Sequence, residues 1–142
     1  MFQNNDLTNM SKFNQEIDQL PESLIGLLLR YTMFNKEIQK LPSLLEYLSL
    51  PYDYNLRIKC LPKGIKDIEI GYYTQIEEYP DDVDRLNLIN DGKILRNVQK
   101  NFNVNKLPKN LKVLEIEDCS KCILECKLPD TLLYYNGDKT YE

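Results

Sequence analysis

The sequence predicts a solenoid: about six short units stacked into one short parallel β-sheet, right-handed and with little helix. Two observations lead to this prediction. A Leu-Pro or Tyr-Pro pair recurs with its proline at positions 21, 42, 62, 80, 108 and 129, so successive units are 21, 20, 18, 28 and 21 residues long. Aliphatic residues then follow each proline at the same three offsets. A repeated period of about this length is typical of a repeat architecture.

The three offsets predict which side chains form the core. Positions three, six and eight after each proline hold Leu, Ile or Val at sixteen of eighteen sites, and the two exceptions, Tyr135 and Gly137, lie in the last unit. Offsets six and eight have the period of two of an extended strand, so both side chains point to one face. One unit cannot bury that face alone, whereas strands stacked about 4.8 Å apart bury it in a continuous core.

A helical bundle is the alternative for a leucine-rich periodic chain. Its apolar residues would recur at three and four, then seven and eight, and the unit prolines would interrupt its helices. Units of 18 to 21 residues leave room mainly for extended segments or 3₁₀ turns on the back. In the 28-residue unit, Ile94, Leu95 and Val98 have near-helical spacing and Asp91 could cap a helix. We expect either a short helix at about residues 93–101 or a plain loop there.

Length and composition limit the function classes. The 142 residues suffice for a single domain, 1–142, that opens with a short polar segment, 1–12. The net charge of −4 argues against a nucleic-acid partner. The chain has no histidine, which removes the usual general base and the commonest metal ligand. No apolar run is long enough for a signal peptide or a membrane span, so we expect a soluble, cytoplasmic protein without a membrane partner.

Cysteines form the one cluster that could support catalysis or metal binding. Cys119 and Cys122 make a C-x-x-C pair, and Cys126 follows. A structural zinc site needs four converging ligands, and the fourth cysteine, Cys60, lies in a distant unit. We therefore expect no metal, no cofactor and no catalytic residue. Thiol redox chemistry at Cys119 and Cys122 remains the enzymatic alternative.

The outward face of the predicted sheet is the candidate binding site. Its residues differ from unit to unit, whereas the core positions repeat, as on a binding surface built on a structural scaffold. Its first rows are apolar or aromatic and its later rows are acidic, which favours a partner with a basic surface. The alternative is that this face is only solvated. The predicted partner-binding residues are Leu28, Arg30, Tyr47, Asp67, Glu69, Arg85, Asn87, Glu115, Glu117 and Tyr134.

A second sequence phrase lies shortly before each of the first two Leu-Pro pairs, and two residues separate it from the pair. It reads Phe13-Asn14-Gln15-Glu16-Ile17 and then Phe34-Asn35-Lys36-Glu37-Ile38, with a weaker copy at residues 54–58. With the phrase Leu-Pro-x-x-Leu-x-x-Leu-x-Leu, it resembles the FNIP repeats, a leucine-rich-repeat variety abundant in social amoebae and in giant viruses that infect amoebae. The resemblance covers residues 13–142 and implies a leucine-rich-repeat solenoid of α/β type. Glu16 and Glu37 stand where the family has proline, so the back turn is expected to be less rigid.

The resemblance implies a non-enzymatic protein–protein interaction module, acting in the cytoplasm, or in the host cytoplasm if the protein is viral. Some relatives place an F-box before their repeats. Only twelve residues precede Phe13 here, so we expect that adaptor module to be absent. Asp138 and Lys139 follow the last predicted strand and would discourage edge pairing, so we expect mainly a monomer. The alternative function is a structural component of a larger assembly, such as a virion, with the solenoid ends as contacts.

Overall fold

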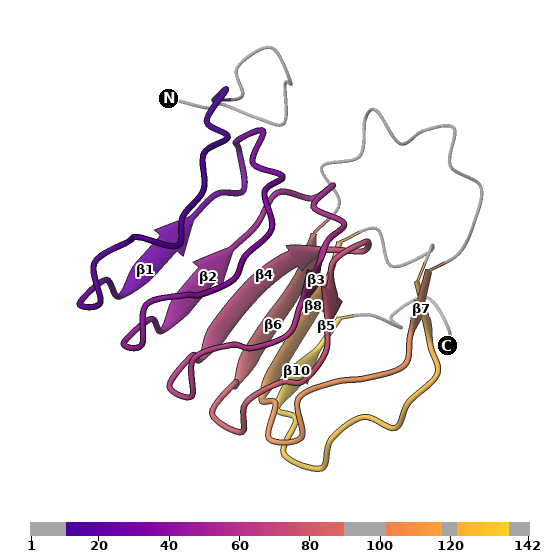
Figure 1. The fold of residues 1–142 in the computed structure, drawn as a ribbon. Coiled ribbons are helices and arrows are strands. Elements are labelled where there is room, and N and C mark those ends of the chain that lie inside the picture. Colours follow the sequence, from indigo (N-terminus) through magenta and orange to yellow (C-terminus); the bar gives the residue numbers. More distant parts are fainter. Residues whose placement is uncertain (1–10, 90–101, 118–121, 137–142) are drawn as a thin grey trace.

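The computed structural model describes residues 11–89, 102–117 and 122–136, which form a parallel β-solenoid (Figure 1). Its main sheet takes one strand from each of the six predicted units. Every neighbouring pair in this sheet is parallel. The strands, in their order across the sheet, are β1 (Gly26–Leu28), β2 (Tyr47–Ser49), β4 (Asp67–Gly71), β6 (Arg85–Ile89), β8 (Val113–Ile116) and β10 (Tyr134–Tyr135).

The register of this sheet is the one that the proline offsets predict. Residues at the same offset lie opposite each other, and their side chains therefore stack through the molecule. At offset six, Leu27 pairs with Leu48, Leu48 with Ile68, Ile68 with Leu86, Leu86 with Leu114, and Leu114 with Tyr135.

The hydrophobic core follows these stacks. At offset six, Leu48, Ile68 and Leu114 are each 0% exposed. Their counterparts in the end units, Leu27 and Tyr135, are only partly buried. The core is therefore closed in the middle of the solenoid and more open at its two ends, because an end unit has a neighbour on one side only.

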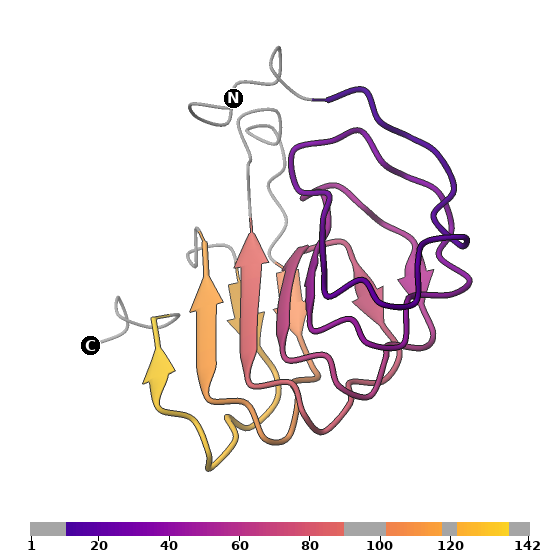
Figure 2. The same cartoon turned by 90° about the vertical axis from the view of Figure 1, so that its left-hand side faces the viewer.

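The back of the solenoid is also extended. Two short parallel sheets lie there, one made of β3 (Arg57–Ile58) and β5 (Gln75–Ile76), the other of β7 (Phe102–Val104) and β9 (Cys122–Leu124). They lie behind the six-stranded sheet (Figure 2). The described residues contain no helix, so they support a β-solenoid and not the α/β class. The helix expected at residues 93–101 lies outside the described residues, and the handedness and the number of complete repeats stay predictions.

The repeated Phe-Asn phrase connects the first units across the back. The ring centroids of Phe13 and Phe34 are 6.2 Å apart, those of Phe34 and Tyr54 are 5.7 Å apart, and both pairs are stacked. Beside them, Asn14 donates from Nδ2 to Asn35 Oδ1 at 2.8 Å, and Asn35 donates from its backbone N–H to Asn14 Oδ1 at 3.0 Å. The phrase thus has a structural role, since its rings extend the core and its amides join adjacent turns.

Candidate functional site

The outward face consists of the side chains at offsets five and seven of the six-stranded sheet, together with Arg30 and Glu117 at offset nine, just beyond β1 and β8. All ten predicted partner-binding residues belong to it. They differ widely in accessibility, from Leu28, which is 67% exposed, to Arg30, whose side chain is 15% exposed. Part of the face is therefore available to a partner, and part is occupied by contacts within the chain.

Arg30 links strands that are far apart in the sheet. Its Nη1 lies 3.1 Å from Glu69 Oε2, and its Nη2 lies 3.2 Å from Glu117 Oε2. Arg30 follows β1 and Glu117 follows β8, four strand spacings away. In a flat sheet this separation would be about 19 Å, too far for the two side chains to meet. The sheet is therefore curved, and its outward face is concave.

Glu69 is the centre of this network. Its Oε1 accepts a hydrogen bond from Ser49 Oγ at 2.6 Å, and its Oε2 accepts one from Asn87 Nδ2 at 3.0 Å as well as the one from Arg30. Ser49 is 0% exposed, although its offset places it on the outward face. The Glu69 side chain is only 16% exposed, so the middle of the face is closed by charge-assisted hydrogen bonds.

A second group of charges, the Arg85 cluster, remains accessible. Arg85 Nη1 lies 3.0 Å from Glu115 Oε1, and Arg85 Nε lies 3.9 Å from Asp67 Oδ2. The exposed fractions of the three side chains are 35% for Asp67 on β4, 45% for Arg85 on β6 and 37% for Glu115 on β8. Burial raises the pKa of Asp67 above its ordinary value, and the Arg85 guanidinium opposes that rise. Tyr47, the neighbour of Asp67 on β2, has its pKa raised by burial and by the Glu69 and Asp67 charges.

The outward face has a net negative charge among the described residues. It holds four carboxylates and two guanidinium groups, those of Asp67, Glu69, Glu115, Glu117, Arg30 and Arg85. The sequence pattern gave no sign of the Arg30 contacts. Those contacts join residues 39 and 87 positions apart, and they depend on the curvature of the sheet.

Residues 34–73 match a family model described as FNIP Repeat. This chain carries an FNIP repeat. The matched stretch begins at Phe34 of the aromatic stack, includes β2, β3 and β4, and ends in the turn after β4. It therefore contains Ser49 and Glu69 of the network as well as the central part of the core. Comparisons with curated proteins and with solved structures found no match.

Thiols and metal ligands were the other candidates in this FNIP-repeat chain. Cys60 and Cys126 are free thiols. Burial raises the pKa of the Cys126 thiol, which is the opposite of the change that activates a nucleophilic cysteine. Cys119 lies outside the described residues, so the predicted pair with Cys122 has no described geometry. Within the described ranges, no three cysteine or carboxylate side chains come together as a possible metal site.

The part of the chain that the structure describes contains no helix with the length and apolar character needed to cross a bilayer.

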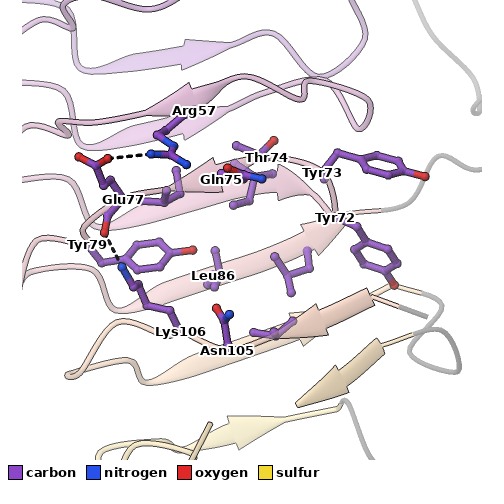
Figure 3. Close-up of a pocket in the computed structure, with 15 residues that line it drawn as sticks. Arg57, Tyr72, Tyr73, Thr74, Gln75, Glu77, Tyr79, Leu86, Asn105 and Lys106 are labelled. Atoms are coloured by element: carbon purple, nitrogen blue, oxygen red, sulfur yellow. Dashed lines mark hydrogen bonds and ion pairs between the residues drawn. The ribbon is translucent and has the colours of Figure 1, made fainter. Parts of the chain in front are cut away.

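A cleft of about 530 Å³ opens on the back, beside the end of the FNIP repeat (Figure 3). It lies between β5 and residues 104–106, where the two back sheets are not paired. Glu77 lines the edge of the cleft and connects residues on its two sides. The Glu77 carboxylate lies 3.3 Å from Arg57 Nη1, and the Glu77 carbonyl accepts a hydrogen bond from Lys106 Nζ. The Tyr79 ring lies beside Leu86 in the interior, and burial raises its pKa. The sequence did not predict this cleft, because it depends on which back strands pair.

Proposed function

We propose that this FNIP-repeat solenoid is a non-enzymatic protein-interaction module that binds another protein through its outward face. The observation that supports this most strongly is the contrast between the two faces of one sheet. The inner face repeats aliphatic residues, whereas the outward face presents different polar side chains held in fixed positions by the Arg30 network and the Arg85 cluster. A rigid surface loses little conformational entropy when a partner binds.

The charge of the outward face favours a partner with a basic surface. The Arg85 cluster is its most accessible charged part, and two of the three charges in it are negative. Leu28 and Tyr134 add exposed apolar and aromatic area at the two sides of the sheet. Complementary charge mainly accelerates association, and exposed aromatic side chains are frequent anchors in interfaces.

The absence of an enzymatic role in this proposal rests on chemistry. The chain has no histidine, and burial raises the pKa of the Cys126 thiol, which makes the reactive thiolate form less available. A cytoplasmic location is part of the same proposal, since free thiols suit a reducing compartment.

Site-specific photo-crosslinking tests the proposed surface. A photo-reactive residue is placed at Arg85 or at Glu115 on the outward face, and at the exposed Lys59 or Glu78 on the back as matched controls. Each variant is irradiated in an extract of the cells that make the protein, and adducts are identified by mass spectrometry. We expect one protein to be crosslinked from both outward positions and from neither control. Adducts formed only from the back positions would contradict the proposal.

A further inference from the structure

The residues at offset four form a continuous row along one border of the sheet. Each backbone N–H in the row donates to the carbonyl of the same offset in the preceding unit. These bonds are Glu46 to Ile25 at 2.8 Å, Lys66 to Glu46 at 2.9 Å, Asp84 to Lys66 at 2.9 Å, Lys112 to Asp84 at 2.9 Å and Leu133 to Lys112 at 2.8 Å. The four inner members alternate in charge, whereas the two end members, Ile25 and Leu133, are apolar.

Apolar side chains are exposed at both ends of the sheet. Ile25 is 51% and Leu28 67% exposed at the β1 end, and Leu133 is 82% and Tyr134 45% exposed at the β10 end. Elsewhere, the large hydrophobic side chains exposed to this degree among those whose burial is described are Met33 at 56% and Leu44 at 57%, both in the first two units. End units that cap a solenoid usually present a polar outer surface. These two ends instead expose apolar side chains, which are stabilised when another apolar surface packs against them.

The two ends also have matching backbone groups. At each inner junction, two consecutive N–H groups donate to one carbonyl: Glu46 and Tyr47 donate to Ile25 O at 2.8 and 3.1 Å. By the same rule, the N–H groups of Ile25 and Gly26 point away from the sheet at one end, and the Leu133 carbonyl points away at the other. Among the described residues, no strand pairs with the outer edge of β1 or of β10.

We propose that the β10 end of one copy of this chain docks on the β1 end of a second copy, so that the parallel sheet continues from copy to copy. Leu133 of one copy then packs against Ile25 of the next, which extends the offset-four row through an apolar junction. Tyr134 lies at the offset of Gly26, whose missing side chain leaves room for the ring. Because all strands are parallel, the contact joins two different surfaces, and copies can add one after another.

This proposal replaces the expectation of a monomer, which rested on Asp138 and Lys139, two residues outside the described part of the chain. Its test uses Ile25 and Leu133 at offset four, which are not part of the outward face, although Leu28 and Tyr134 at the two ends are. Substitution of Ile25 or Leu133 therefore disrupts the end-to-end contact without changing the Arg85 cluster, and substitutions in the Arg85 cluster leave both ends unchanged.

Sedimentation velocity and light scattering over a concentration series test the proposal. For the native 142-residue chain we expect the average mass to rise above 16.8 kDa as concentration increases. Ile25→Glu and Leu133→Glu each place a charge at one end, and each should weaken association by about tenfold or more. Leu44→Glu is the matched control, because Leu44 is 57% exposed but lies outside the row, and it should associate like the native chain.

Mixing the two end variants distinguishes this contact from edge pairing between identical ends. The Ile25→Glu copy retains an intact β10 end and the Leu133→Glu copy an intact β1 end, so an equimolar mixture should form a dimer that cannot grow further. Circular dichroism confirms that each variant is folded. A native chain that stays at 16.8 kDa throughout, variants that associate normally, or a mixture that stays monomeric would each overturn the proposal.

Discussion

Leu48 lies between Leu27 and Ile68 in the offset-six stack and is 0% exposed. Its replacement by alanine leaves a cavity that neighbouring turns cannot fill without moving. We therefore expect Leu48→Ala to lower the free energy of unfolding by about 2–5 kcal/mol, measured by urea denaturation.

Leu44 provides the control for this substitution, because it is a leucine in the same unit with 57% of its side chain exposed. Leu44→Ala should change the free energy of unfolding by no more than about 0.5 kcal/mol. If Leu48→Ala were equally mild, the assignment of offset six to the core would be wrong.

Glu22 joins two adjacent turns through its carboxylate. Its Oε1 accepts a hydrogen bond from the Ser43 N–H at 2.9 Å, and its Oε2 lies 3.0 Å from Lys40 Nζ. These contacts, the Ser43 bond foremost, lower the pKa of Glu22 from 4.5 to about 2. Since the folded-state pKa is lowered, the contribution of Glu22 to stability is complete above pH 4.5 and is lost as the pH falls toward 2.

The expected result is that native protein loses more stability than Glu22→Gln when the pH falls from 4.5 to 2. Urea denaturation at several pH values measures the difference, and carboxyl titration by nuclear magnetic resonance measures the pKa itself. Parallel pH profiles for the two proteins, with a Glu22 pKa near 4.5, would show that these contacts do not persist in solution.

At the scale of single elements, β4 and the turn after β2 are held at a close distance by a glycine. A β-carbon added to Gly71, the last residue of β4, would lie 1.8 Å from the carbonyl oxygen of Tyr52. That atom belongs to the backbone and cannot rotate away. We expect Gly71→Ala to lower the free energy of unfolding by about 1–3 kcal/mol or more, as overpacking does elsewhere.

Gly64→Ala is the matched control for this backbone contact, because nothing lies within 4 Å of its added β-carbon. It should leave the free energy of unfolding within about 0.5 kcal/mol of the native value. Equal effects of the two substitutions in thermal or urea denaturation would mean that β4 and the Tyr52 turn are not in close contact.

The elements show how far the sequence alone determines this fold. The proline period and the aliphatic offsets predicted the strands and their register, because only one alignment of the units buries Leu48, Ile68 and Leu114 together. The same offsets could not predict that β5 pairs with β3 and β7 with β9 but β5 and β7 do not pair with each other, since the offsets describe the main sheet and not the back strands. Nor could they predict the burial of Ser49, whose hydroxyl donates a hydrogen bond to Glu69 on β4, because Glu69 is held in the network by contacts from distant units.

At the scale of the whole molecule, Arg30 connects β1 to β4 and β8 across the concave face. Its side chain is 15% exposed, and Arg30→Ala would leave Glu69 and Glu117 without this partner. We expect this substitution to lower the free energy of unfolding by about 1.5–3 kcal/mol, the usual range for hydrogen bonds to charged groups. A double-mutant cycle with Glu69→Ala should give a coupling of about 0.5–3 kcal/mol.

The exposed ion pair of Arg57 and Glu77 is the control cycle, since its side chains are 59% and 48% exposed. Its coupling should stay below about 1 kcal/mol, because solvent and salt screen a surface pair. A coupling between Arg30 and Glu69 no larger than this would indicate that the network does not hold the concave face together.

The association rate of the crosslinked partner tests the role of the outward face most directly. Asp67→Asn with Glu115→Gln removes two accessible negative charges from the Arg85 cluster, while Glu37→Gln with Glu78→Gln removes two exposed charges from other parts of the surface. At low salt we expect the first double variant to associate more slowly than native protein by about twofold or more, and the difference should shrink as salt is added. The second double variant should associate at the native rate. If the first variant also associated at the native rate at low salt, the outward face would not be the surface that a basic partner recognises.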